Sequence, residues 1–201
     1  MSGTLLLASA SPRRREMLSR VGLLLELRPA DIDETPLPDE DPAVYVRRLA
    51  RAKAAAVTRP ADAWVLAADT TVTLDRQILG KAESPEEAAK MLRWLSGRTH
   101  QVLTAFCLVG ERDGQPVIHE GAVSTDVEMI ELDGAMLADY VASGEWRGKA
   151  GAYAIQGIGA ALVAEVRGSV TNVIGLPLVE VLAALRAAGG PIPRFAAGTP
   201  S

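Results

Sequence analysis

The chain has 201 residues, of which 48% are hydrophobic and 23% charged, a composition typical of one globular domain or two closely joined lobes. A formal net charge of -4 argues against binding to a polynucleotide, which requires a basic surface. The longest apolar stretches are far shorter than the roughly 20 residues of a membrane-spanning helix. With a single cysteine and no secretory signal pattern, we expect a cytoplasmic protein that does not bind membranes.

The first predicted unit is a strand at residues 4–8, a Ser-x-Ser-Pro turn and a helix at about residues 12–20. Three arginines fall in the first turn of this helix, where the helix dipole favours negative charge. A bound phosphate would remove that conflict, and two serines add hydroxyl donors. The alternative, a solvated basic helix start capped by serine, is equally consistent with the pattern. The residues concerned are Ser9, Ser11, Arg13, Arg14 and Arg15.

The next predicted elements are a strand near residues 24–28, an acidic loop containing Glu34, and a helix from Pro42 to about Val57. On this helix Lys53 is placed on or beside the apolar stripe. A lysine at such a position either extends along the surface to solvent or reaches into a cleft.

Asp69 terminates the apolar run of residues 64–68 in a strand predicted over residues 64–73, and we expect it at a strand end. Asp69 and Glu34 together with a triphosphate would suit Mg²⁺ or Mn²⁺, which bind oxygen ligands. Either carboxylate could instead be an ordinary turn or surface acid. Lys81 follows a short hairpin, where an exposed loop lysine is the alternative to a ligand.

The second half of the chain is predicted to alternate hairpins and helices, which indicates an α/β fold with a mixed sheet. The glycine-bearing loop around Gln156 lets the backbone approach a ligand, and the amide suits reading a base edge. Gln156 could also serve the loop alone. We interpret His100 and His119 as structural or exposed, and Cys107 as a packed small hydrophobe. The predicted elements are helices at 84–95, 135–141 and 178–188, strands at 102–109, 117–130 and 161–166, and a flexible tail at 191–201.

Segments spread along the whole chain resemble, in order, the Maf family of nucleotide pyrophosphatases. This resemblance implies one domain over residues 1–190, with an elongated mixed β-sheet and flanking helices that form two lobes around a nucleotide cleft. The implied topology is similar to that of inosine triphosphate pyrophosphatases. The segments are Leu-Ala-Ser-Ala-Ser-Pro-Arg-Arg at 7–14, Asp-Glu at 33–34, Leu-Ala-Arg-Ala-Lys-Ala at 49–54, Ala-Asp-Thr at 68–70, Leu-Gly-Lys at 79–81, Leu-Ser-Gly at 95–97, Gly-Ala-Tyr-Ala-Ile-Gln-Gly at 151–157 and Gly-Leu-Pro at 175–177.

The resemblance implies cleavage of a nucleoside triphosphate between its α and β phosphates, with a divalent metal. It makes Asp69 the proton acceptor, and Glu34 and Asp69 metal ligands. The implied phosphate-binding and catalytic set is Ser9, Arg13, Arg14, Lys53 and Lys81.

The combination of Arg13, Thr70 and Gln156 resembles the dTTP/UTP-cleaving branch of the family, because the 7-methyl-GTP branch differs at those positions. A 7-methyl-GTP-type pyrophosphatase and a nucleotide-binding regulator of septum formation are the alternatives. The family also implies a homodimer. Val170 stands where many relatives carry an aromatic residue, so the segment at 168–172 is given no role.

Overall fold

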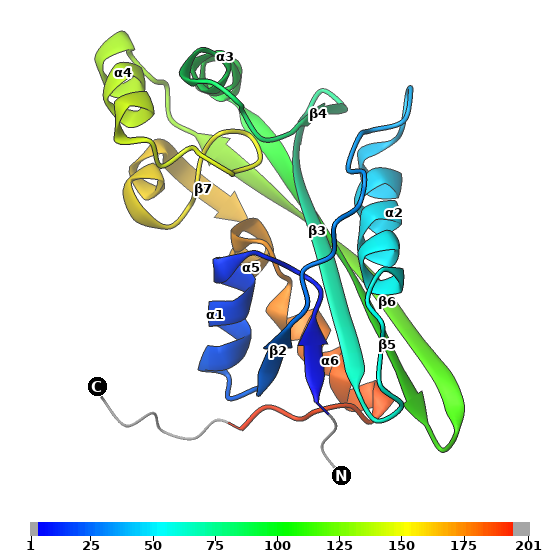
Figure 1. Ribbon diagram of the computed structural model, residues 1–201. Coiled ribbons are helices and arrows are strands. Elements are labelled where there is room, and N and C mark those ends of the chain that lie inside the picture. The colour runs from blue at the N-terminus through cyan, green and yellow to red at the C-terminus, as the bar shows by residue number, and fades with distance from the viewer. Residues whose placement is uncertain (1–3, 195–201) are drawn as a thin grey trace.

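A seven-stranded mixed sheet forms the centre of the computed structural model, which describes residues 4–194 (Figure 1). The strand order is β2-β1-β3-β5-β6-β7, and β4 pairs with β3. Strand β1 is parallel to β2 and β3, whereas the remaining pairs are antiparallel, so the predicted mixed sheet is confirmed. The strands are β1 (Leu5–Leu7), β2 (Leu25–Leu27), β3 (Trp64–Leu74), β4 (Gln77–Leu79), β5 (Thr99–Arg112), β6 (Gln115–Met129) and β7 (Val163–Arg167).

Most of the α-helices begin where a side chain accepts a hydrogen bond from a free N–H group of the first turn. Ser11, Asp41 and Ser84 each accept a hydrogen bond from the first turn, and a proline follows each of them. Across residues 4–194 no helix is long and apolar enough to cross a membrane. The helices are α1 (Pro12–Arg20), α2 (Pro42–Ala55), α3 (Pro85–Leu95), α4 (Gly134–Ser143), α5 (Val170–Ile174), α6 (Leu178–Ala188) and the 3₁₀ turn η1 (Gly157–Leu162).

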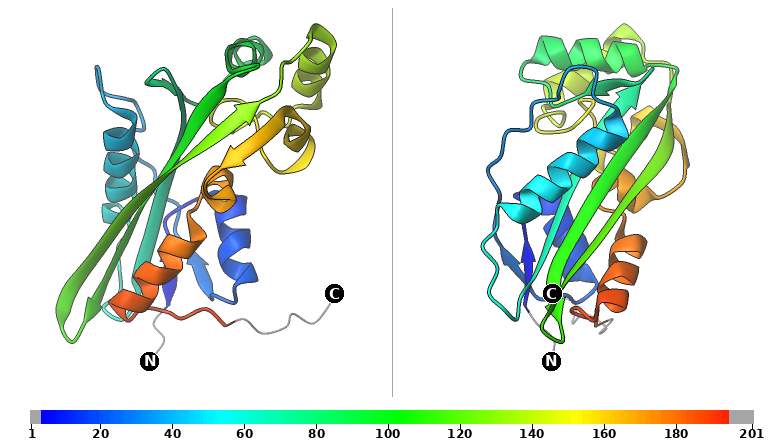
Figure 2. Two further views of the ribbon diagram at one scale, coloured as in Figure 1. Left: turned by 180° about the vertical axis from the view of Figure 1, so that it is seen from behind. Right: turned by 90° about the vertical axis from the view of Figure 1, so that its right-hand side faces the viewer.

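The alternation of side chains along the strands assigns the helices to the two faces of the sheet. Leu5 and Leu7 pack with α1 and α6, whereas Leu6 on the same strand packs with α2. Figure 2 shows α2 on one face, with α1 and α6 on the other. Because the same alternation holds in β3, Asp69 and Thr70 face opposite sides of the sheet.

The hydrophobic core is divided into separate clusters. One lies under α1 and α6, and a second lies under α2. A third joins α3 and α4 to the far ends of β3, β5 and β6. The division of residues 1–190 into two lobes stays a prediction. Of the predicted tail, residues 191–194 lie in coil, and residues 195–201 lie outside the described residues.

One edge of β3 is left unpaired near its centre. Strand β1 pairs with β3 only as far as Leu66, and β4 begins to pair with it at Val72. Between these points no other strand of the described chain covers that edge. A strand edge without a partner presents free N–H and C=O groups, which require other partners or a ligand.

His100 is buried in the core beside the loop that carries Gln156. Its side chain is only 1% exposed, and its Nε2 lies 2.7 Å from the hydroxyl of Tyr153. Burial lowers the pKa of His100 to about 4, so the folded protein holds a neutral imidazole. This buried contact supports the structural interpretation of His100.

We predict that His100 makes the protein less stable in mild acid. The unfolded chain takes up a proton near the ordinary histidine pKa, whereas the folded chain does so only near pH 4, so stability falls as the pH drops between these values. The free energy of unfolding should decrease by up to about 3 kcal/mol over this range. Denaturant titrations at several pH values measure it. His100→Gln should remove this slope and His119→Gln should retain it; an unchanged slope in His100→Gln would contradict the assignment.

Candidate functional site

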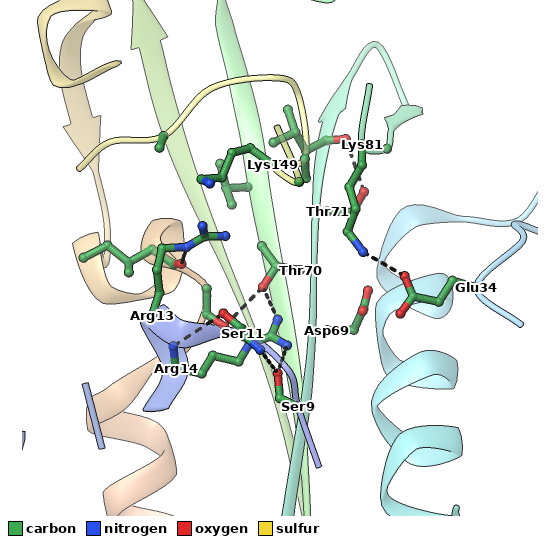
Figure 3. Close-up of a pocket in the computed structure, with 18 of the residues that line it drawn as sticks. Ser9, Ser11, Arg13, Arg14, Glu34, Asp69, Thr70, Thr71, Lys81 and Lys149 are labelled. Carbon is green, nitrogen blue, oxygen red and sulfur yellow. Dashed lines mark hydrogen bonds and ion pairs between the residues drawn. The ribbon is translucent and has the colours of Figure 1, made fainter. Parts of the chain in front are cut away.

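A cavity of about 900 Å³ opens at the unpaired edge of β3 (Figure 3). Its walls come from the loop between β1 and α1, from α2, from the loop at 147–156 and from the turn between α5 and α6. The residues that the family resemblance assigned to the site all line this cavity, although they are widely spaced in the chain, whereas Arg15 of the first helical turn does not. The assigned residues are Ser9, Arg13, Arg14, Glu34, Lys53, Asp69, Thr70, Lys81 and Gln156.

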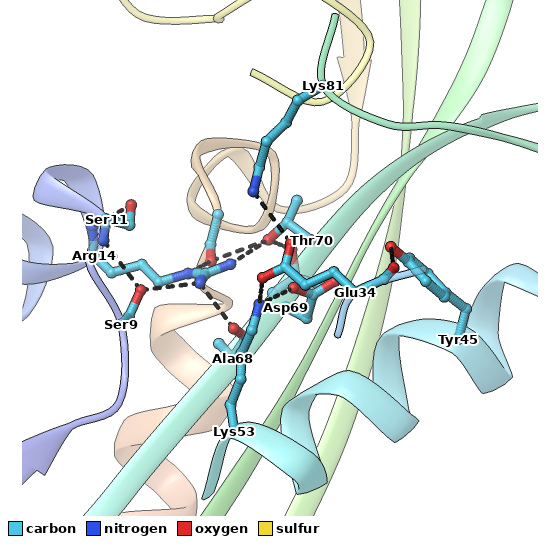
Figure 4. Close-up of polar contacts among 12 residues, drawn as sticks. Ser9, Ser11, Arg14, Glu34, Tyr45, Lys53, Ala68, Asp69, Thr70 and Lys81 are labelled. Atoms are coloured by element: carbon cyan, nitrogen blue, oxygen red, sulfur yellow. Dashed lines mark hydrogen bonds and ion pairs between the residues drawn. The ribbon is translucent and has the colours of Figure 1, made fainter. Parts of the chain in front are cut away.

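Lys53 joins the two acidic residues of the cavity. Its Nζ lies 2.6 Å from Asp69 Oδ1 and 2.6 Å from Glu34 Oε1 (Figure 4). The lysine is only 7% exposed, so of the two alternatives it reaches into a cleft. A buried ammonium is stable only when it is paired, and here it has two anionic partners.

The two carboxylates have different electrostatic environments. Desolvation raises the pKa of Asp69, although Lys53 and Arg14 oppose that change. Desolvation also acts on Glu34, but hydrogen bonds and charge attraction from Lys53 and Lys81 outweigh it and lower the pKa of Glu34. Paired carboxylates with pKa values moved in opposite directions are the usual basis for separate acid–base roles.

Asp69 lies in the middle of β3, so the expected position at a strand end is wrong. The strand continues to Leu74 because its backbone pairs with β5 as far as Thr73 and with β4 from Val72 to Leu74. The neighbouring parallel strand β1 ends earlier, opposite Leu66. Asp69 therefore reaches the carboxyl edge of the parallel part of the sheet, where ligands commonly bind.

The loop that carries Glu34 is held against α2. The hydroxyl of Tyr45 donates a hydrogen bond of 2.9 Å to the backbone oxygen of Glu34. Lys81 Nζ lies 3.2 Å from Glu34 Oε2, although the lysine side chain is 61% exposed. Lys81 is therefore an exposed lysine with a partner in the site. Nothing in the sequence pattern indicated the contact of Tyr45.

Arg14 is buried, and most of its N–H groups donate hydrogen bonds to other groups of the protein. Its Nε donates to Gly175 O at 2.7 Å, and its Nη2 donates to Thr70 Oγ1 at 2.9 Å. Its Nη1 donates to Ala68 O at 2.8 Å and to Ser9 Oγ at 3.2 Å. A guanidinium has five N–H donors, so four of them are occupied. Arg14 thus covers part of the open edge of β3.

A polar network that the sequence analysis missed supports Thr70. Its hydroxyl lies 2.8 Å from that of Thr104, which donates to Asn172 O at 3.0 Å. Asn172 is fully buried and donates to Val102 O at 2.8 Å. The segment at 168–172, which had no predicted role, therefore forms the start of α5 and holds this network. Its detectable signal was Ser169, which caps α5.

Ser9 in the loop between β1 and α1 and Arg13 in the first turn of α1 keep donors for a ligand. Ser9 Oγ accepts from Ser11 N and Arg14 Nη1, and its own O–H has no acceptor within residues 4–194. Arg13 donates from Nε to Ile174 O at 3.2 Å, which leaves the outer nitrogens of its guanidinium toward the cavity (Figure 3). This arrangement agrees with the anion-binding interpretation of the loop.

Gln156 stands on a loop that Glu145 fixes. Glu145 accepts from the backbone N–H groups of Ile158 at 2.9 Å and Gly159 at 2.7 Å. Gln156 immediately precedes this 3₁₀ turn and is exposed at the cavity. Cys107, by contrast, is buried under α2, and burial raises the pKa of its thiol to about 11, so it is a packed residue as predicted.

The expected metal ligands form a pair and not a cluster. Across residues 4–194 no group of three or more histidine, cysteine or acidic side chains is placed to hold a metal ion. Glu34 and Asp69 converge through Lys53, and both residues line the cavity. Two carboxylates suit Mg²⁺ when phosphate oxygens of a substrate complete its coordination.

The fold and the cavity define an α/β protein whose site joins paired carboxylates to several cations. The profile of the Maf-like protein family matches residues 4–188. A dTTP/UTP pyrophosphatase from Anaeromyxobacter dehalogenans (strain 2CP-1 / ATCC BAA-258) is 53% identical over 96% of this chain and 98% of its own length. A dTTP/UTP pyrophosphatase from Myxococcus xanthus (strain DK1622) is 50% identical over 94% of each chain. The chain belongs to the Maf-like protein family.

A solved structure from Mycobacterium abscessus, described as a nucleoside-triphosphatase or dITP/XTP pyrophosphatase, is also similar. It is 16% identical, covers 91% of this chain and 94% of its own, and has a TM-score of 0.42.

Arg14→Met should destabilise the fold by about 2–4 kcal/mol, because it leaves buried carbonyls without a donor. Chemical denaturation with and without the substitution measures the difference. Arg15, the next residue, is exposed, so Arg15→Met should change stability by less than about 0.5 kcal/mol. Equal effects of the two substitutions would show that the contacts of Arg14 are not important for stability.

Proposed function

We propose that this protein hydrolyses dTTP and UTP at the α–β bond and releases the nucleoside monophosphate and pyrophosphate. The observation that carries the proposal is Lys53 between Asp69 and Glu34 inside the cavity. The names of the relatives, which share about half of their residues with this chain over nearly its whole length, support the same activity.

In the proposed reaction Asp69 accepts a proton from a water molecule whose oxygen attacks the α-phosphorus. The bond from the α-phosphorus to the bridging oxygen breaks, and the electron pair leaves with pyrophosphate. Burial raises the pKa of Asp69, which makes its carboxylate a stronger base than that of an exposed aspartate. Lys53 holds the Asp69 carboxylate in place, and Ser9 and Arg13 orient the phosphates by donating hydrogen bonds.

A divalent metal fits the proposed site. Glu34 and Asp69 would hold Mg²⁺ or Mn²⁺ together with phosphate oxygens. When bound, the metal neutralises phosphate charge and polarises the phosphoryl oxygens. The lowered pKa of Glu34 keeps that carboxylate ionised and available as a ligand.

We assign substrate specificity to Thr70, Gln156 and Arg13. Gln156 offers a donor and an acceptor at the cavity, which suits the O4 and N3–H edge shared by uracil and thymine. Thr70 is held rigidly by Arg14 and Thr104, so its position is well defined. The cytoplasmic location and the homodimer remain predictions.

Pyrophosphate release from dTTP, UTP, CTP and 7-methyl-GTP tests the proposal. With Mg²⁺ or Mn²⁺ we expect rapid release from dTTP and UTP, slower release from the other two, and loss of activity when a chelator removes the metal. Preference for 7-methyl-GTP would move the protein to the other branch of the family. No release from any triphosphate would exclude the proposed reaction.

Asp69→Asn should lower the rate of dTTP and UTP turnover by about 10²–10⁴-fold, because the amide cannot accept the proton. Binding of UTP should be retained, since Lys53 keeps its charge and Glu34 still pairs with it. Steady-state rates and equilibrium titration measure the two effects separately. The control is Asp75→Asn at the turn of the β3–β4 hairpin, which should keep full turnover. Full activity in Asp69→Asn would remove Asp69 from this role.

A further inference from the structure

The cations that line the cavity differ in the partners that the protein already gives them. Lys53 pairs with both carboxylates, and Lys81 pairs with Glu34. Arg14 is occupied by hydroxyl and carbonyl oxygens of the protein. The guanidinium carbon (Cζ) of Arg147 lies 4.9 Å from the centroid of the Trp146 ring, a cation–π contact. These four cations have partners even without a ligand.

Arg13 and Lys149 have neither an ion pair nor an aromatic contact among the described residues, and each makes fewer hydrogen bonds than Arg14. Within residues 4–194 neither forms an ion pair, and each makes only one side-chain hydrogen bond to a backbone carbonyl, those of Ile174 and Arg147. They approach the cavity from different walls, Arg13 from α1 and Lys149 from the loop after α4 (Figure 3). Desolvation and then the charge of Arg13 lower the pKa of Lys149, and the charge of Glu145 partly opposes them.

The backbone around Lys149 is fixed on both sides. Its N–H donates to Trp146 O at 3.1 Å, and the next residue, Ala150, forms an antiparallel bridge with Lys81. Gly151 N also donates to Gly80 O at 3.0 Å. These contacts hold the loop backbone in place before a ligand binds. Less conformational entropy is therefore lost when Lys149 binds an anion.

We propose that Arg13 and Lys149 together form an anion subsite that holds the pyrophosphate part of the triphosphate, an inference that rests on the proposed function. The terminal phosphates carry the highest negative charge of the substrate, and two cations that form no ion pair within residues 4–194 suit that charge. Asp69 and Glu34 lie on the other side of the cavity, against α2, so this subsite is separate from the proton acceptor (Figure 3). The sequence analysis missed Lys149 because a lysine between glycine and alanine in a loop has no distinguishing pattern.

The test is calorimetric titration of the full-length protein with inorganic pyrophosphate and, separately, with UMP in a buffer containing Mg²⁺. Lys149→Met should weaken pyrophosphate binding roughly tenfold or more, because it removes a charged hydrogen-bond donor. UMP binding should stay within about twofold, since UMP lacks the phosphates that this donor contacts. Lys149→Arg should keep most of the affinity. Lys90→Met, on the exposed surface of α3 and outside the cavity lining, is the matched control and should change neither titration.

The inference is overturned by unchanged pyrophosphate binding in Lys149→Met, by an equal loss of UMP and pyrophosphate affinity in that variant, or by absence of pyrophosphate binding in the wild type. A thermal melt of each variant shows that a loss of affinity does not come from unfolding. Failure of the proposed function is a different result. If Lys149 is needed for pyrophosphate binding but no triphosphate is hydrolysed, the anion subsite is supported and the proposed reaction is excluded.

Discussion

The ion pairs of Lys53 with Asp69 and Glu34 are the interaction on which the site depends. All three groups lie at the cavity, and removing charges from water is unfavourable unless each charge has a partner. The pairing requires α2 to pack against the face of β3 that carries Asp69, and it requires the acidic loop to return over α2. Tyr45 meets the second requirement by its bond to the backbone of Glu34. Lys53 favours the ionised form of both carboxylates, but desolvation outweighs it at Asp69 and raises the pKa there, whereas the pKa of Glu34 is lowered.

The opposite face of β3 is organised by Arg14. Because β1 is short, the β3 edge beyond Leu66 is not covered by a strand, and the guanidinium supplies the missing donor to Ala68 O. It also connects α1 to Gly175, whose φ of 127° lies in a region that favours glycine. The unpaired edge of β3 is therefore flanked by two sets of side chains: the acid–base groups on the α2 face of the sheet and the anchoring groups on the α1 face.

Local patterns predicted the elements best where short-range chemistry decides the structure. The helix starts at Pro12, Pro42 and Pro85 are confirmed because each follows a side chain that satisfies the first turn. The predicted strands at 102–109 and 117–130 are joined by a tight turn at Asp113 and Gly114, and both turn residues have positive φ. The long strands were predicted too short. Strand β5 runs from Thr99 to Arg112 because pairing with β6 extends it beyond its apolar centre.

The sequence by itself determined the residue types of the site, the order of the motifs and the family to which the chain belongs. These properties depend only on the identity of single residues and on their spacing within short segments. Only the tertiary structure decided that Lys53 bridges two carboxylates, that Arg14 binds mainly the protein, and that Lys149 reaches the same cavity. Such contacts join segments that are far apart in the chain, as Arg14 and Gly175 show. Long-range packing and burial set which charges find a partner, and neither is encoded in a local pattern.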